Sequence, residues 1–155
     1  MSTESSYQLQ QSLYTLYRNY YHSGCVTLLY NKDFKTGTYQ IKKPGLYVVC
    51  EDITFNPDEM YLETEAQYTE NKAYTMGYFA ALTVECDDVV IDLQGHMIRQ
   101  SFEHYFKQRF FSVVELANSP FISNQGPGSI NQSASEYAFV SAKNCMIING
   151  TLGLS

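Results

Sequence analysis

The chain has 155 residues, 45% of them apolar, with a formal net charge of −6 and a sequence pI near 4.9. This size and apolar content predict one folded domain with a real core and exclude a disordered chain. The acidic balance argues against nucleic acid and anionic membrane surfaces as partners, because neither would attract it electrostatically, and no apolar run approaches the roughly 20 residues of a membrane span.

The N-terminal segment predicts an amphipathic helix over residues 7–21. Ser5 and Ser6 can cap its start. Its apolar side chains recur at helical spacing and form one stripe: Leu9, Leu13, Leu16, Tyr17, Tyr20 and Tyr21. Because this stripe needs a surface to cover, we expect residues 1–24 to form a capping helix over the open end of a β stack.

After Gly24 the pattern changes to short strands separated by Gly, Asn, Asp and Pro turns. The expected strands are 25–30, 38–42, 46–55, 76–84, 89–98, 109–116, 138–140 and 145–149. Two polar segments, 56–75 and 117–136, are expected to be exposed loops. Residues 25–155 therefore predict a mainly β domain.

One order of residues occurs twice. Residues 84–98 and 140–152 each hold a polar pair, an apolar run, a Gly and a closing apolar residue, and Asp88 and Asn144 lie 144 − 88 = 56 positions apart. Because the order of residues recurs in the same direction along the chain, it predicts parallel strands in which equivalent residues lie above one another. An antiparallel barrel or jelly roll is the alternative.

The alignment of the two stretches has an internal gap. Ile91 stacks on Ile147, but one or two residues must be skipped between Ile91 and Gly95. Asn149 then falls where a core residue would point inward. We expect Asn149 to occupy a turn instead and to bond through its side-chain amide to the equivalent group of the adjacent coil.

Several segments resemble right-handed parallel β-helix proteins. Residues 37–41, 44–49 and 51–55 resemble the opening coil of such proteins, residues 88–98 are similar to the coil motif of the pectate-lyase-like superfamily, and residues 144–152 resemble its next occurrence. The overall arrangement resembles β-helix repeat proteins encoded by large DNA viruses of protists and algae. The resemblance covers residues 37–155 and implies a right-handed solenoid.

Acidic pairs are the first candidates for catalysis. Glu51-Asp52, Asp58-Glu59, and Asp87-Asp88 with Asp92 can supply a general acid and base for glycoside cleavage, or a Ca²⁺ site for a polysaccharide lyase. A turn role explains Asp87-Asp88 more simply, since Asp accepts bends and satisfies local backbone donors. We therefore predict no catalytic residues.

The histidines His22, His96 and His104 have no His or Cys at ligand spacing, so no metal and no cofactor are expected. A sugar-binding groove is the remaining candidate site. It would use Arg99, Tyr105, Lys107 and Arg109, because aromatic faces and charged hydrogen-bonding groups suit carbohydrates. Packing of the aromatics, with the basic side chains reaching to solvent, is the favoured alternative.

These features favour a non-catalytic structural or recognition module, such as a viral structural or surface component or an assembly subunit. The rival is the N-terminal part of a polysaccharide lyase or glycoside hydrolase acting on acidic polysaccharide. The last repeat has no visible cap, so we expect its coil to bind another copy of the chain or another structural protein. Glycans are further expected partners. Without a signal peptide, the expectation is cytoplasmic synthesis, four reduced and mostly buried cysteines, and incorporation into a virion.

Overall fold

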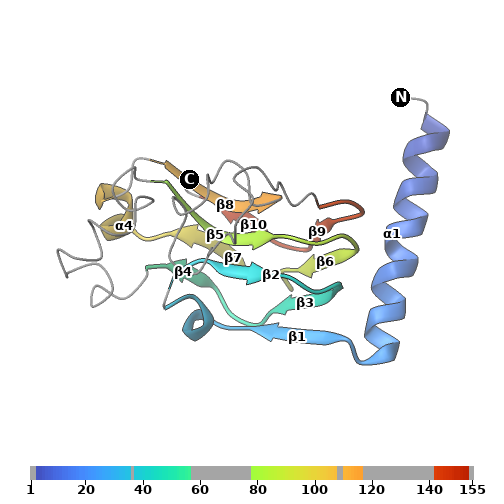
Figure 1. Cartoon of the computed structure of the whole chain (residues 1–155), viewed down its shortest axis with the longest axis horizontal. Coiled ribbons are helices and arrows are strands. Elements are labelled where there is room, and N and C mark those ends of the chain that lie inside the picture. Colours follow the sequence, from blue (N-terminus) through green and yellow to red (C-terminus); the bar gives the residue numbers. More distant parts are fainter. Residues whose placement is uncertain (1–2, 36, 57–77, 108–109, 117–141, 154–155) are drawn as a thin grey trace, which may run out of the picture.

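The computed structural model describes residues 3–35, 37–56, 78–107, 110–116 and 142–153, and strands predominate in it (Figure 1). The elements are α1 (Thr3–Ser23), β1 (Val26–Leu29), the 3₁₀ helix η1 (Asn31–Phe34), β2 (Tyr39–Ile41), β3 (Gly45–Val49), β4 (Ile53–Phe55), β5 (Tyr78–Val84), β6 (Val89–Asp92), β7 (Met97–Gln100), α4 (Phe102–Lys107), β8 (Phe110–Leu116), β9 (Met146–Ile148) and β10 (Thr151–Gly153). All pairings between the described strands are parallel. The mainly β class, the parallel arrangement and the N-terminal helix are confirmed.

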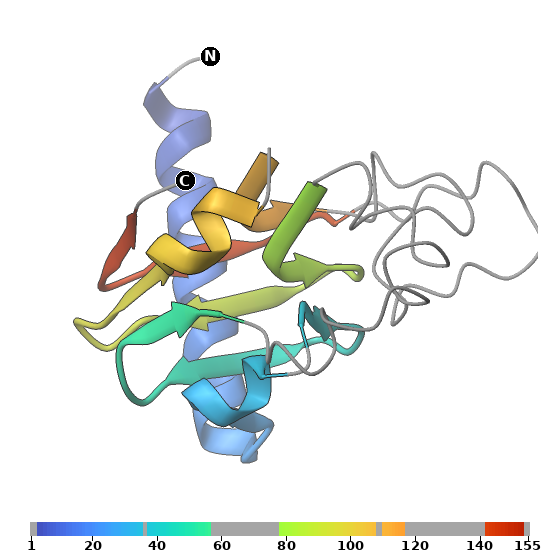
Figure 2. The ribbon, with the colours of Figure 1, turned by 90° about the vertical axis from the view of Figure 1, so that its left-hand side faces the viewer.

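The strands form three parallel sheets. Sheet A has the order β1-β3-β6-β9, sheet B has β2-β5-β8, and sheet C has β10-β7-β4. The chain visits A, C and B through β3, β4 and β5, visits them again through β6, β7 and β8, and returns to A and C through β9 and β10 (Figure 2). We call these three sets the lower, middle and upper tiers. Each tier pairs with the next one.

The register of the tiers matches the repeat in the sequence. Val90 of β6 pairs with Met146 of β9, a separation of 146 − 90 = 56. Met97 of β7 pairs with Thr151 of β10, a separation of 151 − 97 = 54. Two residues are therefore skipped after Asp92, as the alignment required. Ile91 pairs with Ile147 as expected.

Other boundaries differ from the sequence prediction. The expected single strands 46–55 and 89–98 are each divided into two strands that belong to different sheets. Helix α4 was not predicted, and the turn expected at Asn31 is the 3₁₀ helix η1. The expected strand 138–140, the loop 117–136 and all but the first residue of the loop 56–75 lie outside the described residues.

The core lies between the three sheets. Because side chains alternate along a strand, every second residue points inward. The inward residues of neighbouring tiers stack on one another, as Tyr47 does with Ile91 in sheet A and Ile53 with Ile98 in sheet C, and all four are buried.

Helix η1 closes the lower end of this core. Phe34 of η1 is buried against the interior cluster. Asn31 covers the free edge of β4, because its amide nitrogen donates to the Asp52 carbonyl at 2.6 Å and its amide oxygen accepts from the Thr54 N–H at 3.0 Å. The Asn31 side chain thus supplies hydrogen-bond partners to backbone groups of an edge strand that would otherwise be exposed.

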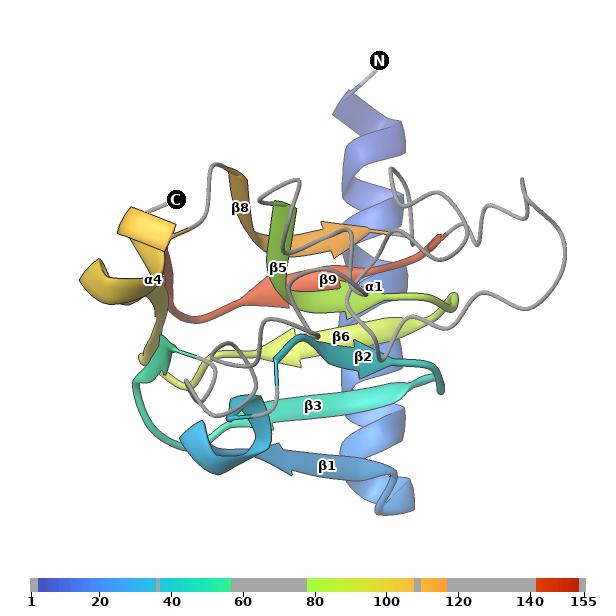
Figure 3. The same cartoon turned by 60° about the vertical axis from the view of Figure 1, so that its left-hand side comes forward.

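Helix α1 does not cap an end of the tiers, and the predicted position of the capping helix is wrong. The helix crosses the outer face of sheet A (Figure 3), where Tyr17 bonds to Asp92, the last residue of β6, and Tyr20 bonds to the carbonyl of Asp88, which directly precedes β6. The outward-facing Leu46 and Val90 are fully buried, so sheet A offers an apolar outer surface. The helix covers this surface rather than the core end.

Two further expectations concern the cysteines and the membrane. The four cysteines are free thiols, but Cys25 is exposed and Cys50, Cys86 and Cys145 are partly buried, which corrects the expectation of mostly buried side chains. Among the described residues, no helix has both the length and the apolar character that crossing a membrane requires.

Candidate functional site

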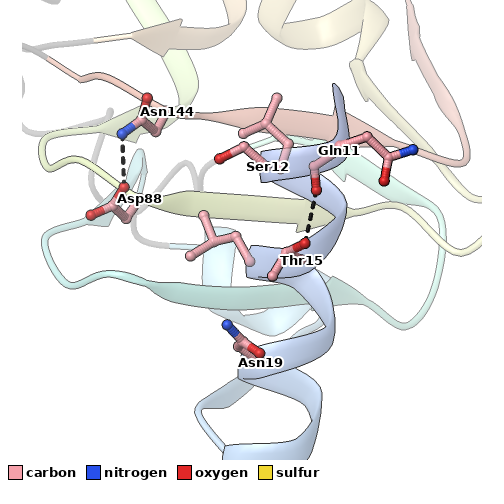
Figure 4. Close-up of a pocket in the computed structure, with 8 residues that line it drawn as sticks. Gln11, Ser12, Thr15, Asn19, Asp88 and Asn144 are labelled. Carbon is pink, nitrogen blue, oxygen red and sulfur yellow. Dashed lines mark hydrogen bonds between the residues drawn. The ribbon is translucent and has the colours of Figure 1, made fainter. Parts of the chain in front are cut away.

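A groove of about 410 Å³ lies between α1 and the turns that precede β6 and β9 (Figure 4). Six of its eight lining residues are polar. The helix contributes Ser12, Thr15 and Asn19, which recur at helical spacing on one side of α1, and the turns contribute Asp88 and Asn144; Gln11, Leu13 and Leu16 complete the lining. The groove therefore offers hydroxyl, amide and carboxylate groups beside an apolar surface that makes up the larger part of its exposed lining.

The two turns have the same backbone geometry. Asp88 has φ 61° and Asn144 has φ 53°, in the left-handed region that Asp and Asn tolerate better than other side chains with a Cβ. The Asn144 amide donates to the Asp88 carboxylate at 3.1 Å, and the Lys143 N–H donates to the Asp87 carboxylate at 2.7 Å. The turn interpretation of Asp87-Asp88 is confirmed.

Asp92 is a buried carboxylate beneath α1. It accepts hydrogen bonds from the Tyr17 hydroxyl at 3.0 Å, from the Gln94 N–H at 3.0 Å and its amide at 2.6 Å, and from the Asn149 amide at 3.1 Å. Burial, and then the bond to Asp92 and its charge, raise the pKa of Tyr17 above its usual value, so the phenol remains a donor. The carboxylate is satisfied and shielded from solvent.

Asn149 lies in a turn as expected, with φ 58°. Its amide bonds across the tiers, but to Asp92 and not to the equivalent position, because Asp92 pairs with Ile148.

Asp52 joins the lower tier to the middle tier. Its carboxylate accepts the Met97 N–H at 3.0 Å and lies 3.3 Å from Nδ1 of His96. The pKa of Asp52 is lowered, mainly by the Met97 backbone hydrogen bond and then by His96. Glu51 accepts the Asn31 N–H at 2.7 Å. Asp58-Glu59 lies outside the described residues.

The predicted sugar-binding residues are placed on separate elements. Arg99 is exposed on β7, where its Nε donates to the Thr54 hydroxyl at 3.4 Å, and Tyr105 is exposed on α4. Lys107 is the last residue of α4, and Arg109 lies outside the described residues. Two more aromatic rings of α4, Phe102 and Phe106, are exposed beside Tyr105. We call Phe102, Tyr105 and Phe106 the α4 aromatic patch.

His104 points the opposite way and is buried under α4. Its Nδ1 lies 2.6 Å from the Gln100 amide nitrogen, and its ring meets the Phe55 ring edge-on at 5.0 Å. These contacts give His104 a packing role. Within the described ranges, no three His, Cys, Asp or Glu side chains gather as a metal ion would require.

The groove beside α1 was missed by the sequence analysis. Tyr17 and Tyr20 do not line the groove, but they were the signal for the contact between α1 and sheet A that forms it, because partly buried phenols favour a partner for their hydroxyl groups. The sequence does not show that the partners lie on β6. The chain matches no protein-family model, no curated protein and no solved structure.

Proposed function

We propose that the chain is a non-catalytic structural and recognition module, built from the first coils of a right-handed parallel β-helix. Each tier would be one coil. The repeated visit to sheets A, C and B through parallel strands supports this proposal. Right-handedness follows the strong preference of connections between parallel strands.

The use of the described acidic side chains carries the non-catalytic part of the proposal. Asp52 binds the Met97 N–H of the next tier, Asp88 binds Asn144 of the next tier, and Asp92 binds Asn149. Both oxygens of the buried Asp92 are occupied by protein donors, whereas the Asp52 side chain is 74% exposed and accepts the Met97 N–H through Oδ1 alone. A general acid or base must be within reach of a substrate proton, which Asp92 is not.

The position of α1 adds to this argument. Polysaccharide-active enzymes that the sequence resembles place their carboxylates on the outer face of one parallel sheet. On sheet A that face is covered by α1, and its carboxylate Asp92 is fully buried. A body of this kind suits stiff display, as in a viral structural or surface component.

An activity assay tests the proposal against the enzyme alternative. The chain is incubated with pectin-like and alginate-like polymers, with and without Ca²⁺, and new reducing ends are counted. We expect the same background from the wild-type chain and from the Asp88→Asn variant, which keeps the turn geometry. Release that depends on protein concentration and is lost in Asp88→Asn would show that the chain is an enzyme.

A second candidate function is glycan recognition by the α4 aromatic patch. Three exposed rings on one short helix are the observation that favours it, because sugar faces stack on aromatic rings. A glycan array with the wild-type chain and the Tyr105→Ala and Arg99→Ala variants tests it, with Tyr14→Ala as the control on α1. We expect binding to fall about 10-fold in the first two variants and to be unchanged in the control.

A further inference from the structure

Two of the four thiols lie close together at the start of the middle and upper tiers. Cys86 comes just before the turn that leads into β6, and Cys145 directly precedes β9. The Sγ atom of Cys145 lies 3.8 Å from the carbonyl oxygen of Cys86. Both side chains pack against the interior cluster and both are partly exposed. They therefore share one place at the margin of the core, within reach of small molecules in solution.

The turn at Asp88 accounts for this approach. By register, Cys145 stacks on Val89. The chain bends between Cys86 and Val89, at the left-handed position of Asp88 with φ 61°, and the Cys86 carbonyl is thereby brought beside Cys145. The Asp88 N–H also donates to the Lys143 carbonyl at 2.9 Å, which holds the two turns against each other. The backbone thus fixes the position of one cysteine relative to the other.

The charges around Cys86 agree with this geometry. Burial contributes most to the raised pKa of Cys86, and the charge of Cys145 contributes next, so the two sulfurs interact. Weaker contributions come from the carboxylates Asp87, Glu85 and Asp88. Burial also raises the pKa of Cys145, although a hydrogen bond from the Val89 backbone opposes the rise. Both thiols are therefore protonated at neutral pH.

A link at this position would secure the least covered part of the described fold. The strands β9 and β10 have three residues each. Ile147 and Leu152 in these strands are 36% and 41% exposed, whereas Ile91 and Ile98, on which they stack, are 1% and 0% exposed. Short strands with partly exposed side chains open more readily than the strands of the core.

We propose that Cys86 and Cys145 form an intrachain disulfide that joins the upper tier to the middle tier. The oxidant is a low-molecular-weight disulfide such as glutathione disulfide. The thiolate of one cysteine attacks a sulfur of the oxidant and releases one glutathione thiolate. The thiolate of the other cysteine then attacks the protein sulfur of this mixed disulfide and releases the second. The two cysteines lose two electrons and two protons overall, and glutathione disulfide is reduced to two molecules of glutathione.

The surroundings suit a structural bond rather than a rapid switch. Attack requires a thiolate, and both thiols are protonated at neutral pH, so the link forms slowly. A thiol of raised pKa is also a poor leaving group, so the bond is reduced slowly once it has formed. The two cysteines lie 145 − 86 = 59 positions apart. The link therefore closes a long loop and strongly restricts the unfolded chain.

A variant that keeps only these two thiols tests the proposal. The full chain with Cys25→Ser and Cys50→Ser is incubated with glutathione disulfide at about pH 8.5, near the usual pKa of a thiol. Intact mass and peptide mapping without reductant should show the loss of two hydrogens, no bound glutathione, and a linked pair of peptides that hold Cys86 and Cys145. The wild-type chain should give the same linked pair.

Single substitutions in that background are the matched controls. Cys86→Ser and Cys145→Ser each leave one thiol of the pair, and each should retain one bound glutathione. The linked chain should melt about 10 °C higher than its reduced form, as expected for a loop and a chain of this size, whereas oxidant should not raise the melting temperature of the controls. Cys86→Ala and Cys145→Ala replace a serine variant that does not fold.

Four results would overturn the proposal. Two bound glutathiones on the variant with only Cys86 and Cys145 would show that the thiols cannot reach each other. A disulfide between two chains, or a wild-type map that links Cys86 to Cys25, would assign these thiols to other partners. A linked chain that melts no higher than its reduced form would show that the bond does not secure the upper tier.

Discussion

Removal of the Tyr17 hydroxyl tests whether Asp92 fastens α1 to sheet A. In Tyr17→Phe the ring is kept, and the carboxylate loses one of its donors while Gln94 and Asn149 still bind it. Hydrogen bonds to a charged group contribute about 1.5–3 kcal/mol. Because Tyr17 is only partly buried, we expect the lower value, a decrease of about 1.5 kcal/mol in the free energy of unfolding.

For a chain of this length, that decrease lowers the melting temperature by about 3–6 °C. Urea unfolding and calorimetry measure both quantities, and the urea dependence of the free energy should be unchanged. The control is Tyr14→Phe, on the same helix, because the Tyr14 ring is exposed and stacks on Tyr17 at 6.3 Å. Equal effects of the two substitutions would refute the argument, since the Asp92 bond would then contribute nothing.

The pH dependence of this difference has a defined sign. The pKa of Tyr17 is raised above 10.0 in the folded chain, chiefly by burial. The contribution of its hydroxyl is therefore fully present below pH 10.0 and disappears as the pH rises through the raised value. The wild type and Tyr17→Phe should converge in stability at strongly alkaline pH.

The remaining predictions concern the core, one turn and one carboxylate. Ile91→Asp should abolish cooperative melting, because it places an unpaired carboxylate at a fully buried site and so removes more than about 4 kcal/mol. Gly150→Ala should lower the free energy of unfolding by about 2 kcal/mol, because a Cβ there would collide with Leu93, whereas Gly153→Ala, with its nearest neighbour at 3.7 Å, should change it little. The lowered pKa of Asp52 makes its contribution to stability present above pH 3.8 and lost as the pH falls below that value. In Asp52→Asn, the free energy of unfolding should therefore fall less steeply with decreasing pH than in the wild type. Urea titrations at several acidic pH values that give the same decrease for both proteins would contradict this.

The repeat was a reliable guide to the register of the tiers. Asp88 and Asn144 are equivalent because a left-handed turn position limits the choice of residue, and the sequence therefore kept a visible pattern there. The pairing of Ile91 with Ile147 followed from that alignment. The number of skipped residues could not be fixed in advance, because Gly95 and Gly150 lie 150 − 95 = 55 positions apart and account for only one of the two.

The division of strands could not be read from the same pattern. Residues 46–55 have apolar side chains on both parities, because β3 is covered by the core on one face and by α1 on the other. The alternation that marks a half-buried strand is then missing, and the bend at Cys50–Asp52 is hidden.

The positions of the two helices were also beyond the sequence. The apolar stripe on α1 shows that the helix covers an apolar surface. It does not show which one, because the outer face of a sheet and the end of a core are equally apolar. Helix α4 has six residues, too few to show a period, and its rings Phe102 and Phe106 are exposed. The candidate sugar residues were chosen as neighbours in the chain, whereas Arg99 and Tyr105 belong to different elements.

The crossing of α1 over sheet A has a mechanical consequence. The ladder bonds of sheet A all point along one direction, from β1 towards β9, so a pulling force along that direction would open them one strand at a time. Helix α1, which crosses the strands, resists this separation, because Tyr17 and Tyr20 bind it to β6 while its other contacts reach β3. Tension applied along the strands is carried by the covalent backbone, so α1 strengthens the sheet only against forces that separate its strands.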